Sequence, residues 1–253
     1  MINYSSNDNL YDSRYEKLAP DHEISSLMFS AMTRVPNMAW WQDVRPENSL
    51  LRGRTYRRAK RLMDLFLILS ALPLLLPLLL LCALLIALES PGAPVIFKQK
   101  RTGKGGKPFL MYKFRTMVPN AEALKKELAH LNELQWPDFK IADDPRITRV
   151  GRFLRKTSLD EMPQLLNVWR GEMSLVGPRP TSFSPQTYEL WQTERLDVRP
   201  GVTGLWQIMG RGSMEFEERV RLDVAYIERR CLWLDCQILM RTFTAVLKQR
   251  GAH

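Results

Sequence analysis

The stretch LMDLFLILSALPLLLPLLLLCALLIAL, Leu62–Leu88, decides the fold of this 253-residue chain. From Leu65 to Leu88 it holds 24 consecutive residues without a charge. A helix needs roughly 20 apolar residues to bury itself in a bilayer. A helix in a soluble core is rarely apolar on every face. The stretch therefore predicts a membrane-buried helix.

Two features of this stretch argue against a straight transmembrane span. Pro73 and Pro77 lie near its middle, and each removes a backbone donor and clashes with the preceding turn. Basic residues, which mark the cytoplasmic side of a membrane segment, flank the stretch at both ends. They are Arg52, Arg54, Arg57, Arg58, Lys60 and Arg61 before it, and Lys98, Lys100, Arg101, Lys104 and Lys107 after it. We predict that residues 52–92 form a re-entrant membrane helix hairpin broken at the prolines, with a single-pass span as the alternative.

The net charge of +10 is unevenly distributed along the chain. Residues 1–51 carry four Lys/Arg against seven Asp/Glu, whereas residues 52–253 carry 33 against 20, a net charge of +13. Such a basic body favours an anionic partner, which can be nucleic acid, anionic lipid or a phosphorylated substrate. The three cysteines are irregularly spaced and the three histidines are scattered, which predicts neither a disulfide framework nor a zinc site.

The rest of the chain predicts a polar tail and one compact domain. Residues 1–51 are rich in Asn, Ser and Asp without a sustained period, so we expect a disordered tail without a secretory signal. Residues 93–253 are expected to form a compact cytoplasmic domain that starts with a small β-hairpin, PVIFKQKR and FLMYKFRTM around the turn TGKGGKP. Residues 214–248 read as one or two amphipathic helices that pack on the body or lie in the membrane interface. The predicted fold class is α+β, mostly helical.

Several cations follow patterns that suit phosphate binding as well as a solvated surface. In YKFRTM, Lys113 and Arg115 lie two apart on a strand, which places them on one face. Arg179 in SLVGPRP and Arg199 in VRPGVTGLWQI are each tied to a rigid Pro/Gly turn. A further basic stripe recurs every third residue at Arg146, Arg149, Arg152 and Arg155.

The stretch KTSLDEMPQLLN, Lys156–Asn167, has a structural and a chemical interpretation. Ser158 and Glu161 have the spacing of a capping box, and Pro163 is tolerated only near a helix start. At such a helix start the dipole keeps a carboxylate ionised and also attracts phosphate. An ionised Asp160 could attack phosphorus, and its neighbour Glu161 could bind Mg²⁺. From this stretch alone, capping and catalysis both remain open.

Together these pieces resemble a known family. KRLMDLFL, VIFKQKRTG, YKFRTM, DPRITRVGRFLRKTSLDEMPQLLNVWRGEMSLVGPRP, RPGVTGLWQIMGR and LDVAYI occur in this order. From about Arg58 onward the chain resembles the bacterial sugar transferase family, the monotopic phosphoglycosyl transferases. The order of the pieces makes the joint match specific, although each piece alone is weak.

The resemblance implies transfer of a sugar 1-phosphate from a UDP-sugar to undecaprenyl phosphate or another polyprenyl phosphate, with release of UMP. This is the first membrane step of exopolysaccharide, capsule, O-antigen or glycoconjugate synthesis, at the cytoplasmic face of the inner membrane. The family's nucleophilic aspartate falls on Asp160, and its Mg²⁺-linked glutamate falls on Glu161. The helix-breaking proline falls on Pro77, while Leu76 stands where relatives often have serine, and Pro73 is extra. The candidates for binding substrate phosphate are Lys113, Arg115, Arg155, Arg179 and Arg199.

A rival from another class is a membrane-anchored basic module that binds nucleic acid or anionic lipid without catalysis. It explains the charge and the apolar stretch, but neither the carboxylate pair nor the two rigid arginine loops. We therefore expect an enzyme with UDP-sugar, undecaprenyl phosphate and membrane lipid as partners, Mg²⁺ as cofactor and no nucleic acid. The identity of the sugar and the formation of a homo-oligomer are left open.

Overall fold

The computed structural model describes residues 39–132, 141, 143–183, 185–209 and 214–247. The chain divides into two units, Met1–Asp43 and Val44–His253. The described part of the first unit contains the 3-10 turn η1 (Ala39–Trp41). Most of the predicted tail, residues 1–38, lies outside the described residues, so the prediction of disorder stays a prediction.

The second unit is mostly helical, as the sequence predicts. Its α-helices are α3 (Gly53–Glu89), α4 (Ala121–Glu127), α5 (Arg149–Thr157), α6 (Leu165–Arg170), α7 (Leu205–Met209), α8 (Phe216–Arg229) and α9 (Leu232–Leu247). Short 3-10 segments lie between them: η2 (Pro46–Asn48), η3 (Lys104–Gly106), η4 (Ala129–Leu131), η5 (Leu159–Gln164), η6 (Pro185–Thr187) and η7 (Leu190–Leu196). The one or two helices predicted over residues 214–248 are present as two, α8 and α9.

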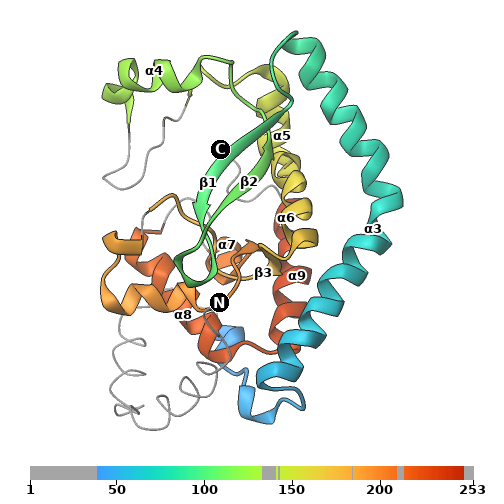
Figure 1. Ribbon diagram of the computed structural model, residues 1–253, viewed down its shortest axis with the longest axis vertical. Helices are drawn as coiled ribbons and strands as arrows, with labels where there is room; N and C mark the ends of the chain where they lie inside the picture. The colour runs from blue at the N-terminus through green and yellow to red at the C-terminus, as the bar shows by residue number, and fades with distance from the viewer. Residues whose placement is uncertain (1–38, 133–140, 142, 184, 210–213, 248–253) are drawn as a thin grey trace, which may run out of the picture. The chain divides into compact units, whose positions relative to one another are not determined.

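Helix α3 is long and apolar enough to cross a membrane. It has 37 residues, and its most apolar 18-residue window has a mean hydropathy of 2.8 with only 11% of that window buried. The helix continues through Pro73 and Pro77, so the predicted break into two separate helices is not formed. Figure 1 shows instead that α3 bends outward near its middle. Bending is the expected effect of two missing backbone donors when the remaining hydrogen bonds keep the helix continuous.

Both arms of α3 contact the same body. Near its start, the Tyr56 hydroxyl donates a hydrogen bond of 2.9 Å to Asp235 of α9. At its end, the Glu89 carboxylate accepts a hydrogen bond of 3.1 Å from the backbone N–H of Val150, at the start of α5. Between these contacts the helix projects side chains such as Leu74, which is 78% exposed. The apolar middle of α3 is therefore unpartnered while its two ends are fixed.

The predicted β-hairpin is present, and a second pair of strands joins the two Pro/Gly/Arg loops. Strands β1 (Ile96–Thr102) and β2 (Pro108–Phe114) pair antiparallel around η3. The sequence interpretation missed the parallel pair β3 (Ser174–Val176) and β4 (Gly201–Thr203). A Cβ at Gly201 would lie 2.1 Å from the backbone nitrogen of Gly177, so this close approach requires glycine.

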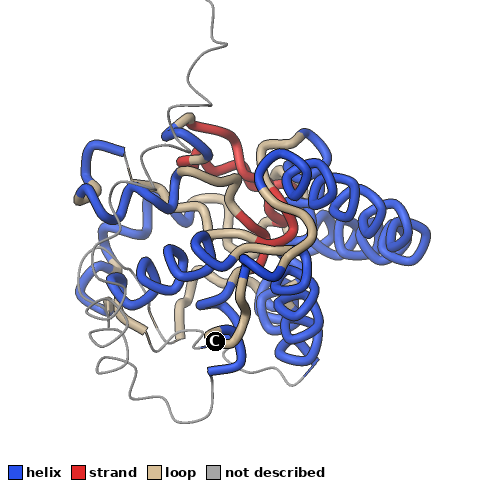
Figure 2. Tube along the Cα trace, turned by 90° about the horizontal axis from the view of Figure 1, so that it is seen from below, coloured by secondary structure: helices blue, strands red, loops and turns tan. Residues whose placement is uncertain are grey.

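Part of the core lies where α3 packs against the hairpin and against α5 and α6. Two buried clusters line this contact. They comprise Ile68, Met111, Val168 and Met173 in one, and Cys82, Ile86, Phe114 and Leu154 in the other. Figure 2 shows the strands with helices on both sides. The hairpin, α5 and η5 are therefore held against each other, and this packing positions the site described next.

Candidate active site

The carboxylate pair lies on η5, directly after a reversal of the chain. Helix α5 is capped by the Thr148 hydroxyl, which accepts a hydrogen bond of 3.0 Å from the backbone N–H of Gly151. The helix ends at Ser158, whose φ of 58° places it in the left-handed region. Ser158 makes no side-chain cap to η5, so the predicted capping box is wrong. The physical reason is that the Glu161 side chain binds two cations, which attract it more strongly than a backbone N–H does.

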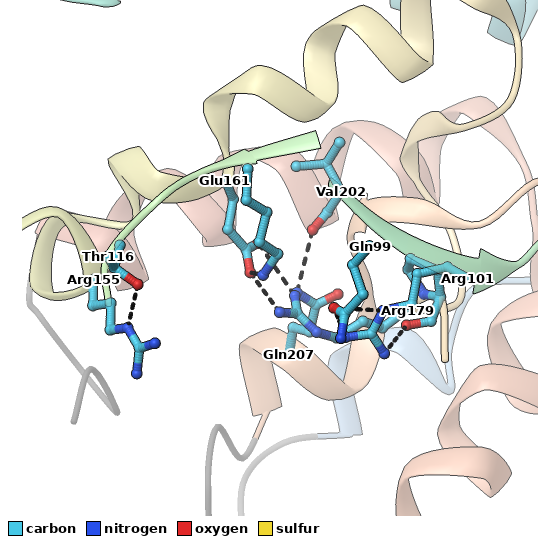
Figure 3. Close-up of polar contacts among 10 residues, drawn as sticks. Gln99, Arg101, Thr116, Arg155, Glu161, Arg179, Val202 and Gln207 are labelled. Atoms are coloured by element: carbon cyan, nitrogen blue, oxygen red, sulfur yellow. Dashed lines mark hydrogen bonds and ion pairs between the residues drawn. The ribbon is translucent and has the colours of Figure 1, made fainter. Parts of the chain in front are cut away.

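Glu161 contacts both Lys113 of β2 and Arg179, and Figure 3 shows its contact with Arg179. Its Oε1 lies 2.9 Å from Lys113 Nζ, and Arg179 donates from Nη1 to Oε2 at 3.2 Å and from Nη2 to Oε1. The three side chains are 16%, 18% and 32% exposed, in the order Glu161, Lys113 and Arg179. Burial alone would raise the pKa of Glu161, but Arg179 and Lys113 outweigh it and hold that pKa well below its ordinary value. Glu161 is therefore ionised.

Asp160 faces the same cations without being hydrogen-bonded by them. Its carboxylate accepts no hydrogen bond from the residues that the structure describes. Burial raises the pKa of Asp160 above its ordinary value, Lys113 opposes this shift, and the adjacent Glu161 adds to it. A carboxylate that is poorly solvated and accepts no hydrogen bond is a better nucleophile than one whose lone pairs are occupied. The two neighbouring carboxylates thus have different environments.

Arg155 approaches Asp160 from α5. Its Nε donates a hydrogen bond of 2.9 Å to the Thr116 hydroxyl. Burial lowers the pKa of Arg155, and the nearby Asp160 partly offsets this effect. Figure 3 shows Arg155 and Thr116 apart from the contact between Glu161 and Arg179. Of the five predicted phosphate-binding cations, Lys113 and Arg179 contact Glu161 directly, and Lys113, Arg155 and Arg179 are close enough to Asp160 to act on its pKa.

The structure does not bring the other two candidates into this cluster. Strand β2 ends at Phe114, so Arg115 lies beyond the alternation that would align it with Lys113, and its Nη2 donates at 3.4 Å to the carbonyl of Ser90. Arg199 lies beside Gly171, where an added Cβ would be 3.7 Å from Arg199 Nη2 and 3.8 Å from Arg61 Nη2. The roles of Arg115 and Arg199 stay predictions.

The sequence interpretation missed a buried pair that supports Arg179. Arg195 Nη2 donates to the carbonyl of Arg179 at 2.9 Å and to Asp223 Oδ2 at 2.6 Å. Arg195 lies on η7 and Asp223 on α8, and both side chains are almost fully buried. A signal was present, because Asp223 interrupts the apolar side of LDVAYI. A charged residue among apolar neighbours on a helix usually has a buried partner.

The donor set around the pair is compatible with Mg²⁺. Mg²⁺ is usually held by one or two carboxylates, together with water and substrate phosphates. Among the residues that the structure describes, no group of three His, Cys, Asp or Glu side chains could hold a metal by itself. Glu161 accepts three hydrogen bonds, whereas a carboxylate has about four lone-pair sites, so Oε2 retains one. One carboxylate position is thus available to an ion whose coordination water and a phosphorylated substrate would complete.

Comparison with known proteins identifies the family. Residues 55–249 match the model of the bacterial sugar transferase family, so the chain belongs to this family. It is 47% identical over 167 residues to the galactosyl transferase CpsE of Streptococcus agalactiae serotype III (strain NEM316), a match that covers 65% of this chain and 37% of that protein.

Two further relatives carry descriptive names. The undecaprenyl-phosphate galactose phosphotransferase of Salmonella typhimurium (strain LT2) is 47% identical over 167 residues, which cover 64% of this chain and 35% of that protein. The UDP-glucose:undecaprenyl-phosphate glucose-1-phosphate transferase of Caulobacter vibrioides (strain CB 15) is 43% identical over 205 residues, which cover 77% and 72%. The chain thus matches less than half of the length of CpsE and of the Salmonella protein, and most of the Caulobacter protein.

Proposed function

We propose that this protein transfers a sugar 1-phosphate from a UDP-sugar to undecaprenyl phosphate or a similar polyprenyl phosphate, with Asp160 as the nucleophile. One observation carries the proposal: Asp160 is a half-buried carboxylate that faces Lys113, Arg155 and Arg179 but accepts no hydrogen bond from the described residues. A purely structural carboxylate in this position would be expected to pair with one of these cations, as Glu161 does.

In the first step a carboxylate oxygen of Asp160 attacks the β-phosphorus of the UDP-sugar. The bond between that phosphorus and the bridging oxygen breaks, the electron pair leaves with UMP, and an aspartyl sugar phosphate forms. In the second step a phosphate oxygen of the polyprenyl phosphate attacks the same phosphorus. The Asp160 carboxylate is released, and the polyprenyl diphosphate sugar is the product. Each step forms one P–O bond and breaks one, so no further reactant is needed.

The cations around the carboxylate pair have separate tasks in this reaction. Lys113 and Arg179 stabilise negative charge that develops on the transferred phosphate, and Arg155 does so from the side of α5. Glu161 keeps Lys113 and Arg179 in place. Glu161 would also hold Mg²⁺, which when bound supplies charge neutralisation for the diphosphate. The permanent positive charge of the cluster is arranged before the substrate arrives.

We further propose that α3 is re-entrant, with both of its ends at the cytoplasmic face of the inner membrane. A straight 37-residue helix would be about 55 Å long, so a membrane span would hold its ends on opposite sides. Instead, contacts through Tyr56 and Glu89 attach both ends to the same body. The bend near the prolines and the basic flanks at both ends support the same geometry. The exposed side chains Trp233 and Phe243 on α9 suit the membrane interface.

The test of activity is UMP release from a panel of UDP-sugars, beginning with UDP-galactose and UDP-glucose because of the names of the relatives. Purified protein is incubated with undecaprenyl phosphate and Mg²⁺, and the panel also identifies the sugar. We expect UMP release with at least one donor and none with Asp160→Asn. A protein that binds nucleic acid or anionic vesicles but releases no UMP with any donor would instead be the non-catalytic basic module.

The test of topology is cysteine labelling in intact cells. In a background with Cys82, Cys231 and Cys236 replaced by serine, a single cysteine is introduced at Ser49 or at Gly92, on either side of α3. The re-entrant geometry predicts that a membrane-impermeant maleimide labels neither position until the cells are permeabilised. Labelling of one position from outside would establish a single span.

A further inference from the structure

Arg101 on β1 is held in place by neutral acceptors only. Its Nε donates to Gln99 Oε1 at 3.1 Å, its Nη2 donates to the same oxygen at 2.5 Å, and its Nη1 lies 3.5 Å from the carbonyl of Pro180. A guanidinium has five N–H groups, so two of them have no acceptor among the residues that the structure describes. Gln99 therefore orients the Arg101 side chain, and part of its hydrogen-bonding capacity remains open.

No carboxylate in the described part of the chain forms a hydrogen bond or an ion pair with Arg101. Pro180, which it contacts, directly follows Arg179, and Figure 3 shows Arg101 and Arg179 next to each other. Burial and the charge of Arg179 lower the pKa of Arg101 to about 10, and the nearby Glu161 only partly offsets this shift. The carboxylate in this region, on Glu161, is hydrogen-bonded to Arg179 and Lys113 instead. A half-buried cation beside a like charge is costly unless an anion completes the site.

The chain next to Arg101 borders a small open cavity. This cavity lies at the end of β1 and the loop after β3. It is lined by Thr102, Gly103, Arg179, Pro180, Thr181 and Arg195, among others. Arg195 and Asp223 fix the backbone at Arg179, so this wall of the cavity is rigid. Arg179 lines the cavity, and so do Thr102, the chain neighbour of Arg101, and Pro180, whose carbonyl lies 3.5 Å from Arg101 Nη1. The hydrogen bonds of Arg179 to Glu161 connect this region to the carboxylate pair.

We propose that Arg101 is a further phosphate-binding residue, which together with Arg179 binds a phosphate group that is not the one attached to Asp160. The inference rests on the proposed function, in which two such groups exist: the phosphate that leaves in UMP and the phosphate of the lipid acceptor. Two donors in one plane match a phosphate bidentately, which a lysine cannot do. The exposed neighbour Lys100 on the same strand provides a matched control for charge alone.

The experiment compares wild type with Arg101→Met, Arg101→Lys and Lys100→Met. The KM of the active UDP-sugar, the inhibition constant of UMP and the KM of undecaprenyl phosphate are measured for each. A charge-assisted hydrogen bond contributes about 1.5–3 kcal/mol, so we expect Arg101→Met to weaken one of these by about 10- to 100-fold. Arg101→Lys should lie between Arg101→Met and wild type, and Lys100→Met should match wild type. Weaker donor and UMP binding assigns the nucleotide phosphate, whereas weaker acceptor binding assigns the lipid phosphate.

Unchanged constants for all three ligands in Arg101→Met would overturn the inference. Thermal unfolding separates a phosphate-binding role of Arg101 from a structural role. Because Arg101 has no ion-pair partner among the described residues, Arg101→Met should leave the Tm equal or higher. A clearly lower Tm with unchanged ligand constants would show that Arg101 only supports the fold. UMP binding without turnover, measured calorimetrically, separates the inference from the proposed function. Loss of UMP binding in Arg101→Met would support the site even if the wild type transferred no sugar. Normal turnover of Arg101→Met, together with unchanged binding of UMP and lipid phosphate, would refute the phosphate-binding role of Arg101 and leave the proposed function intact.

Discussion

The two adjacent carboxylates should respond in opposite ways to removal of their charge. Glu161→Gln removes the partner of Lys113 and Arg179, whereas Asp160→Asn removes a carboxylate that no described residue hydrogen-bonds. Hydrogen bonds to charged groups contribute about 1.5–3 kcal/mol. Because both cations are partly exposed, we take about 1.5–3 kcal/mol as the total loss for Glu161→Gln. For a domain of this size, that lowers the Tm by about 3–12 °C.

The pKa shifts give the same signs. The pKa of Glu161 is lowered by folding, so its contribution to stability is present above its unfolded value of about 4.3 and is lost below it. The pKa of Asp160 is raised by folding, so its ionised form at neutral pH costs stability. Asp160→Asn should therefore leave the Tm unchanged or raise it, within about 2 °C.

The assay is thermal unfolding of detergent-purified protein, followed by tryptophan fluorescence at pH 7.5 and at one fixed scan rate. The fixed rate matters because membrane proteins often unfold irreversibly. Both variants are expected to lose sugar transfer, so activity cannot substitute for the unfolding measurement. The reasoning would be refuted if Asp160→Asn lowered the Tm as much as Glu161→Gln, because Asp160 would then be paired like its neighbour.

Three further outcomes follow from the geometry. Asp223→Ala should lower the free energy of unfolding by about 3–5 kcal/mol and reduce activity, because it leaves the buried Arg195 unpaired. Asp223→Asn should lower it by less. Equal unfolding temperatures for wild type and Asp223→Ala would contradict this prediction. Gly201→Ala should lower the free energy of unfolding by about 1–3 kcal/mol, because its Cβ would clash with the backbone of Gly177. Chemical denaturation of the purified variant measures this loss. An unfolding transition identical to that of the wild type would contradict the close approach of the two glycines. The rate of the first half-reaction should rise with pH through an apparent pKa above the ordinary value of an aspartate, because Asp160 must be ionised and burial raises its pKa. A rate that does not change with pH in the acidic range would argue against that nucleophile.

Local patterns predicted the elements that depend on local chemistry. The apolar run gave α3, and the alternation around TGKGGKP gave the β-hairpin. The capping box failed because its spacing is a local signal, whereas the side chain of Glu161 is held by Lys113 and Arg179 from distant parts of the chain. A pattern within six residues cannot register such competition.

Tertiary contacts explain the other differences. The parallel pairing of β3 and β4 needs Gly177 and Gly201 to approach across the fold, so each loop alone reads as a turn. Arg115 follows the end of β2, and strand alternation therefore misplaced it relative to Lys113. The two prolines of α3 were expected to break the helix, but one missing donor per proline bends it while the flanking hydrogen bonds persist.

The central claim, that Asp160 forms a covalent aspartyl sugar phosphate, is tested most directly by mass spectrometry of the trapped intermediate. Wild type and Asp160→Asn are incubated with the active UDP-sugar and Mg²⁺ without lipid acceptor, quenched in acid and digested. We predict that wild type gains the mass of one sugar phosphate on the peptide that contains Asp160, and that the adduct disappears when undecaprenyl phosphate is added. The account is contradicted if Asp160→Asn carries the same adduct, or if wild type releases product without any adduct on this peptide.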